Sequence, residues 1–126
     1  MKQRRQGAIV LCSSASILAG PIGGQTGSGG PAYVSSKAAI IGLVRTLARA
    51  LGPDGIRVNE ILPGVTETSM IADYSKENRD GQIYRVPLGR IGEPDEIAAV
   101  GCFLISDDAK YITGETVIVN GGAAFG

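Results

Sequence analysis

Three short apolar runs, separated by two helical segments, restrict the topology of this chain of 126 residues. The runs lie at residues 8–12, 56–62 and 116–120, and the first is continuously apolar, as expected for a strand that helices cover on both faces. Connections through a helix join parallel strands and are right-handed in nearly all proteins. We therefore expect an α/β fold with a parallel sheet of three strands in sequence order, doubly covered by helices.

The first helical segment follows a Gly/Pro turn, begins at about Ala32 and ends at Gly52. It places Tyr33 and Lys37 one turn apart on the same face of the helix. A tyrosine hydroxyl is ordinarily a poor proton carrier at neutral pH, and a nearby ammonium favours its phenolate form. The pair is therefore a candidate general acid/base, although the same spacing also arises where a surface aromatic lies beside a surface charge.

Polar groups and turn residues follow the first two apolar runs at the point where each run ends. Ser13 and Ser14 come directly after residues 8–12, and the pair Pro63-Gly64 turns the chain after residues 56–62. In open α/β sheets the ligand crevice lies outside the carboxyl ends of the strands. We therefore expect these groups to lie on the ligand side of the sheet.

The chain contains, in this order, a strand ending in serines, a Tyr/Lys helix and a strand ending in Pro-Gly. This arrangement resembles the short-chain dehydrogenase/reductase family, most of all its 3-oxoacyl-acyl-carrier-protein-reductase-like members. The matching pieces span nearly the whole chain: Ser13-Ser14, Tyr33-Val-Ser-Ser-Lys37, Arg57-Val-Asn59, Pro63-Gly-Val-Thr-Glu-Thr68 and Thr116-Val-Ile-Val-Asn-Gly-Gly122. The resemblance implies an NAD(P)-dependent oxidoreductase that transfers hydride between a nicotinamide and a small alcohol or ketone.

The resemblance also implies roles for three catalytic residues. Tyr33 donates a proton to the substrate carbonyl, Ser14 hydrogen-bonds the carbonyl oxygen, and Lys37 favours the Tyr33 phenolate and binds the nicotinamide ribose. Ser13 and Ser16 are alternatives to Ser14 as the catalytic serine. For Ser13, a role in capping the turn is the simpler interpretation.

The loop after the second strand holds the nicotinamide carboxamide in the family. The implied cofactor site, for NAD or NADP, consists of Tyr33, Lys37, Pro63, Gly64, Val65, Thr66 and Thr68. The alternative for Thr68 is an ordinary helix-capping threonine. The residue that selects between NAD and NADP follows the family's second strand, which has no counterpart in this sequence.

A glycine-rich phosphate turn that follows a strand and opens a helix is absent from the sequence. The glycines of residues 20–30 lie between a strand and the Tyr33 helix, so we expect a flexible loop beside the substrate. Residues 1–126 therefore correspond to the catalytic C-terminal half of a Rossmann-type, doubly wound domain. Two other interpretations stay open: a truncated, inactive domain that serves in assembly, and an unrelated α/β domain that binds a small ligand.

Composition narrows the classes of partner. Twelve basic and twelve acidic side chains leave no net charge, which disfavours nucleic acid or an anionic membrane as a partner. A chain without histidine offers neither a histidine triad nor the common zinc sites. Cys12 and Cys102 lie in apolar runs without Cys-x-x-Cys spacing, so we expect two buried, reduced thiols and no metal. The lack of a long apolar segment or signal peptide predicts a cytoplasmic location.

The Tyr33 helix carries an apolar arc over more than half of its circumference, which is more than one sheet face buries. The resemblance implies that a paired helix of a sister subunit covers the rest, so we expect a homo-oligomer formed through residues 33–51. The alternative is a helix enclosed within one chain. Residues 69–89 mix apolar and charged side chains and are expected to form a substrate lid, followed by a second helix that starts near Pro94.

Overall fold

The computed structural model describes residues 1–19 and 30–126, and its centre is a parallel sheet of three strands in the order β1-β2-β3. β1 spans Gly7–Cys12, β2 spans Ile56–Pro63 and β3 spans Thr116–Val119. The central strand β2 pairs in parallel with both of its neighbours. The predicted sheet, with its strands parallel and in sequence order, is therefore confirmed.

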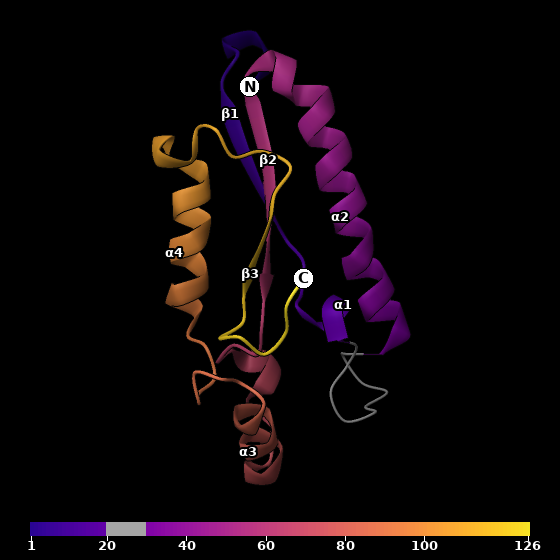
Figure 1. The fold of residues 1–126 in the computed structure, drawn as a ribbon, viewed down its shortest axis with the longest axis vertical. Coiled ribbons are helices and arrows are strands. Elements are labelled where there is room, and N and C mark those ends of the chain that lie inside the picture. Colours follow the sequence, from indigo (N-terminus) through magenta and orange to yellow (C-terminus); the bar gives the residue numbers. More distant parts are fainter. Residues whose placement is uncertain (20–29) are drawn as a thin grey trace.

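Two long helices cover opposite faces of the sheet, α2 over Pro31–Leu51 and α4 over Pro94–Ile105 (Figure 1). Each helix begins with a proline, whose fixed φ suits the first helical turn. α2 packs Val44 and Ala48 against Val58 of β2, and all three side chains are buried. The double covering expected from the apolar first strand is therefore present.

Shorter elements lie around this core. α1 spans Ser16–Ala19, and α3 spans Lys76–Tyr84 within the segment that the sequence predicted as a lid. α3 lies beyond the carboxyl ends of the strands, away from the sheet (Figure 1). The described residues also form four 3-10 turns, which are η1 Lys2–Arg4, η2 Gly52–Asp54, η3 Ser69–Ile71 and η4 Asp107–Ala109. The flexible loop expected at residues 20–30 falls, except for Gly30, outside the described residues.

Arg57 and Asn59 of β2 fasten the end of α4 and the loop after it to the sheet. Arg57 donates from Nη1 to the carbonyl oxygen of Leu104 at 2.6 Å and from Nη2 to that of Ser106 at 2.9 Å. Leu104 lies in the last turn of α4, where carbonyl groups lack partners within the helix, and Ser106 is the residue that follows the helix. Asn59 donates from Nδ2 to the carbonyl oxygen of Ile112 at 2.9 Å. Both residues of the family motif therefore have a structural role.

A carboxylate lies in the middle of β2, where the sequence predicted an apolar strand. Glu60 is 0% exposed, and its Oε1 accepts a hydrogen bond at 2.7 Å from Oγ1 of Thr116. Thr116 lies directly opposite Glu60 in the sheet register, which brings the two side chains together. Within the described part of the chain, Oε2 of Glu60 has no hydrogen-bond partner.

The expectation of two buried thiols is wrong. Cys12 and Cys102 are both free, as predicted, but both are exposed. Cys12 ends β1, which lies at one edge of the sheet, and Cys102 lies on α4 next to Phe103, whose side chain is also exposed. An apolar run in the sequence does not reveal which of its side chains another element covers.

None of the helices in the described residues is both long enough and apolar enough to cross a bilayer.

Apolar surface is left open on α2 and along β1. On α2, Ala38 and Ala39 are exposed and the side chain of Leu43 is 47% exposed, so the described residues do not enclose this helix. In the same residues β1 pairs with β2 alone, so the backbone groups on its other edge have no strand partner. An edge of this kind is a template for pairing with another chain.

We expect the isolated chain of 126 residues to self-associate or aggregate and to bind dinucleotide weakly. The reason is the combination of the open β1 edge with the apolar surface of α2. Analytical ultracentrifugation measures the association, and calorimetric titration with NADH and NADPH measures the affinity. A monodisperse monomer that unfolds cooperatively and binds either nucleotide in the micromolar range would contradict this prediction.

Candidate active site

A cleft of about 650 Å³ lies at the carboxyl ends of the strands. Its lining contains predicted site residues from the α2 helix and from the loop after β2, which are Tyr33, Lys37, Pro63, Gly64, Val65, Thr66 and Thr68. Ligand sites of open α/β sheets are found at this end of the strands. The structure therefore brings the predicted catalytic helix and the predicted cofactor loop to one cavity.

Tyr33 and Lys37 lie together on the first turns of α2. The Lys37 ammonium is 5.7 Å from the centre of the Tyr33 ring, and its Nζ donates to the carbonyl oxygen of Cys12 at 3.1 Å. This bond ties the side chain of Lys37 to the end of β1, so that its charge is held between the strand end and the tyrosine ring. The tyrosine hydroxyl and the lysine ammonium are thereby presented to the same cleft.

The three serines after β1 have different partners. Ser13 is 4% exposed, and its Oγ donates to the carbonyl oxygen of Lys37 at 2.8 Å, so its hydroxyl serves to attach α2 to the strand end. Ser14 is half-buried, and its Oγ accepts a hydrogen bond from Oγ of Ser16 at 2.9 Å. Because the Ser16 hydroxyl is the donor, the Ser14 proton is left to donate elsewhere. Ser13 and Ser16 line the cleft, whereas the predicted Ser14 is not among its lining residues.

The turn after β2 is held tightly against the end of β3. The N–H of Gly64 donates to the carbonyl oxygen of Val119 at 2.9 Å, and a Cβ at Gly64 would lie only 2.7 Å from the Cβ of Asn120. Thr68 occupies the position before η3, but its side chain makes no capping hydrogen bond. The alternative of an ordinary capping threonine is therefore not what the structure shows, and its hydroxyl is available at the cleft.

The residues present fit the nicotinamide end of a dinucleotide. The cleft combines an ammonium, a phenol and threonine hydroxyls with apolar walls, which suits a flat ring that carries an amide and a ribose. Among residues 1–19 and 30–126, the pyrophosphate end has no comparable donor set. Of the three described strands, β1 leads into the short helix α1 through serines, and no glycine-rich turn opens a helix after it.

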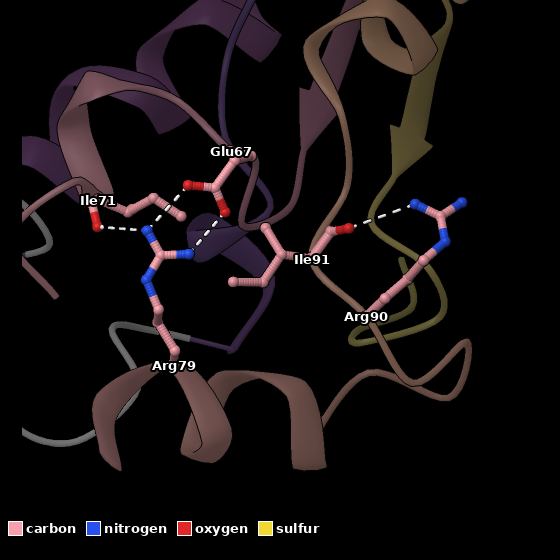
Figure 2. Close-up of polar contacts among 5 residues, drawn as sticks. All are labelled: Glu67, Ile71, Arg79, Arg90 and Ile91. Carbon is pink, nitrogen blue, oxygen red and sulfur yellow. Dashed lines mark hydrogen bonds and ion pairs between the residues drawn. The ribbon is translucent and has the colours of Figure 1, made fainter. Parts of the chain in front are cut away.

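An ion pair that the sequence did not predict links the cofactor loop to α3. Arg79 of α3 donates to both carboxylate oxygens of Glu67, at 2.6 and 2.8 Å, and to the carbonyl oxygen of Ile71 at 3.2 Å (Figure 2). The hydrogen bond from Arg79 lowers the pKa of Glu67 below its ordinary value. A separation of twelve residues across a turn follows no helix or strand period, so no local pattern signals this pair.

A second ion pair stabilises the start of α4. Glu96 accepts hydrogen bonds from the guanidinium of Arg90 and, at 2.8 Å, from the backbone N–H of Glu93. These bonds, that of Arg90 foremost, lower the pKa of Glu96 to about 2. Because the folded-state pKa is depressed, the stabilisation is complete above the ordinary carboxyl pKa and is lost as the pH falls towards about 2. Glu93 and Glu96 therefore form a capping box at the helix that was predicted to start near Pro94.

Other lining residues were not predicted individually as site residues, although some of them lie in the segment predicted as a lid. They come from the strand end, from the lid segment and from the chain after β3, and are Cys12, Ala15, Met70, Ile71, Tyr74, Gln82, Asn120, Ala123 and Ala124. The predicted lid, residues 69–89, contains four of them, so that this segment does form a wall of the cleft. Asn120 lies within the motif that the resemblance singled out, but no spacing rule connects it with the cofactor loop.

Comparisons with known proteins agree with this arrangement. The family model described as enoyl-(acyl carrier protein) reductase matches residues 1–124. A 3-oxoacyl-acyl-carrier-protein reductase of Vibrio cholerae is 42% identical over 123 residues, which are 97% of this chain and 48% of that protein. An L-rhamnose 1-dehydrogenase (NAD(P)+) of Azotobacter vinelandii is also 42% identical, over 96% of this chain and 46% of its own length.

A solved structure has the same fold over this length. The crystal structure of a 3-oxoacyl-acyl-carrier-protein reductase from Brucella melitensis is 38% identical, with a TM-score of 0.88 over 97% of this chain and 44% of that chain. The chain thus spans about half the length of the relatives that it matches. With its sequence motifs, fold and relatives in agreement, the chain belongs to the short-chain dehydrogenase/reductase family and resembles the 3-oxoacyl-acyl-carrier-protein reductases within it.

Proposed function

We propose that this chain forms the catalytic half of an NAD(P)-dependent oxidoreductase that interconverts a small alcohol and the corresponding ketone. The observation that carries the proposal is the pairing of Tyr33 with Lys37 at a cleft that the loop after β2 also lines. Relatives in the family include a reductase of acyl-carrier-protein substrates and a dehydrogenase of a sugar. The substrates of these two enzymes share the alcohol or ketone group and little else.

In reduction, Tyr33 donates its proton to the carbonyl oxygen of the substrate, and in oxidation it accepts a proton from the alcohol. We assign the hydrogen bond to the same oxygen, which stabilises the charge that develops there, to Ser14. Ser16, which lines the cleft and donates to the Ser14 hydroxyl, is the alternative. Lys37 keeps a positive charge beside the Tyr33 ring. A nicotinamide bound in the cleft supplies or receives the hydride.

The cofactor contacts we propose are Tyr33, Lys37, Pro63, Gly64, Val65, Thr66 and Thr68, all of which line the cleft. Support comes from the A. vinelandii relative, whose name specifies NAD(P)+. We propose NAD or NADP without a preference between them. A glycine-rich strand, turn and helix encoded directly upstream in the reading frame would supply the pyrophosphate site that residues 1–126 lack.

The substrate side of the cleft has apolar walls. Met70, Ile71 and Tyr74 line it together with Ile97 of α4. A substrate whose carbonyl lies beside an apolar portion fits these walls better than a highly charged one. The homo-oligomer expected through residues 33–51 is in keeping with the exposed apolar surface of α2, and the cytoplasmic location stays a prediction.

Replacing Lys37 tests this function. In the complete gene product, Lys37→Met should lower turnover and raise the KM for the nicotinamide cofactor, because the ammonium that lies beside the Tyr33 ring at the cleft is removed. The rate is followed by the absorbance of NADH or NADPH with ketone substrates. Lys37→Arg, which keeps the charge, is the matched control and should retain more turnover than Lys37→Met.

Two results would count against the proposal. A gene product that oxidises neither NADH nor NADPH with any ketone would contradict the oxidoreductase function itself. Turnover that is unchanged in Lys37→Met, with only the cofactor KM raised, would limit Lys37 to a contact with the ribose.

A further inference from the structure

The ion pair between Glu67 and Arg79 joins two parts of the cleft that belong to different segments. Arg79 lies in the middle of α3, and Glu67 lies between Thr66 and Thr68, which both line the cleft. Two nearly parallel N–H···O bonds, at 2.6 and 2.8 Å, form the fork-to-fork geometry that arginine and carboxylate prefer (Figure 2). The pair therefore fixes an orientation as well as a distance.

Glu67 is itself anchored to the body of the domain. Its backbone N–H donates to the carbonyl oxygen of Gly92 at 2.8 Å, and the N–H of Gly92 donates to the carbonyl oxygen of Val65 at 3.1 Å. These two bonds form a short parallel bridge between the cofactor loop and the chain that leads into α4. The carboxylate of Glu67 is thus a fixed point on which α3 can be held.

Within α3 itself, in contrast, little else in the described residues holds the helix; the chain is next attached at Val86, which is buried, and at Leu88, whose N–H donates to the carbonyl oxygen of Gly121 at 3.2 Å. None of its nine residues is buried, and a helix of this length is marginal without tertiary contacts. Ser75 caps its first turn by accepting from the N–H of Asn78, but this bond lies within the segment and does not attach it to the domain. The third bond of Arg79 goes to the carbonyl oxygen of Ile71. Ile71 lines the cleft and is only 5% exposed, so this bond attaches α3 to a buried part of the cleft wall.

α3 and the turn before it carry part of the cleft wall. Gln82 on α3 and Tyr74 just before it line the cleft, together with Met70 and Ile71. A shift of α3 therefore moves the wall that faces the substrate. The cofactor loop and the substrate wall are joined by one pair of side chains.

We propose that Glu67 and Arg79 act as a positioning pair, in which the fixed cofactor loop holds α3 in place as the substrate-side wall of the cleft. The effect of the pair on substrate affinity rests on the proposed oxidoreductase function, whereas its effect on the position of α3 does not. Neither residue contacts the reacting atoms. The pair sets the substrate affinity through the position of Tyr74 and Gln82.

Hydrogen exchange tests the effect on α3 without any assay of activity. In the complete gene product, Arg79→Met keeps the apolar stem and removes the fork, and we expect the amides of Lys76–Tyr84 to exchange about fivefold faster, the effect of losing one well-formed surface pair. Glu67→Gln should give the same change. Arg85→Met replaces an exposed arginine at the end of the same helix and is the matched control, expected to leave this exchange unchanged.

The double variant Glu67→Gln/Arg79→Met distinguishes the contact from two separate effects. If the pair is responsible, the double variant exchanges no faster than either single variant. Exchange rates that multiply in the double variant, or exchange of α3 that is unchanged in Arg79→Met, would overturn the proposal.

Kinetics test the consequence for the substrate. With ketone substrate and saturating cofactor, Arg79→Met should raise the substrate KM about fivefold and leave kcat within about twofold, because the wall moves and the proton-transfer residues do not. Faster exchange with an unchanged KM would overturn the link between α3 and the substrate. A wild-type protein without turnover would refute the proposed function alone, and the exchange of α3 would still decide whether the pair positions the helix.

Discussion

Tyr33→Phe should lower the turnover of the complete gene product by about 10²- to 10⁴-fold, the usual contribution of a general acid/base. The substitution removes one oxygen and leaves the aromatic ring in place beside the Lys37 ammonium, which lies 5.7 Å from the ring centre. Folding should therefore be preserved while proton transfer is lost. The measurement is the rate of NADH or NADPH oxidation with ketone substrates.

Two other tyrosines serve as controls for Tyr33. Tyr84 is 92% exposed and Tyr111 is fully exposed, and neither is among the residues that line the cleft. Each Tyr→Phe variant at these positions should keep turnover within a few-fold of the wild type, since neither phenol lies beside a lysine at helical spacing. Turnover near the wild-type level in Tyr33→Phe would show that another group carries the proton.

Leu62→Ala should reduce the free energy of unfolding by about 2–5 kcal/mol, the range for a large apolar side chain removed from a core. Leu62 lies on the central strand β2 and is 0% exposed, so the substitution leaves a cavity that the strands on both sides cannot close. A loss of this size is a large part of the 5–15 kcal/mol that typically separates folded from unfolded protein. Urea denaturation measures it.

The control for this prediction is Leu88→Ala. Leu88 is 68% exposed, so its truncation should change the free energy of unfolding by no more than about 0.5 kcal/mol. Both variants are compared at one protein concentration, because self-association alters apparent stability. Equal midpoints of denaturation for Leu62→Ala and the wild type would contradict the position of Leu62 in the core.

The strand order, the strand direction and the two long helices could be predicted because local patterns encode them. The runs at residues 8–12 and 56–62 differ from the observed β1 and β2 by one residue at one end. Tyr33 and Lys37 were found for the same reason, since a spacing of four residues places two side chains on one helix face whatever surrounds them. α3 was missed because its nine residues are mostly polar and include Gly81, which weakens the helical signal.

By itself, then, the sequence determined the three strands with their parallel order, the two long helices and the tyrosine–lysine pair, all of which follow from periodicity and from short spacings. Only the tertiary structure decided which side chains are buried and which are paired. Glu60 meets Thr116 across 56 positions of the chain, and Glu67 meets Arg79 across 12, at separations that no helix or strand period produces. Such partners are set by sheet register and by the packing of whole elements, which depend on many weak contacts at once.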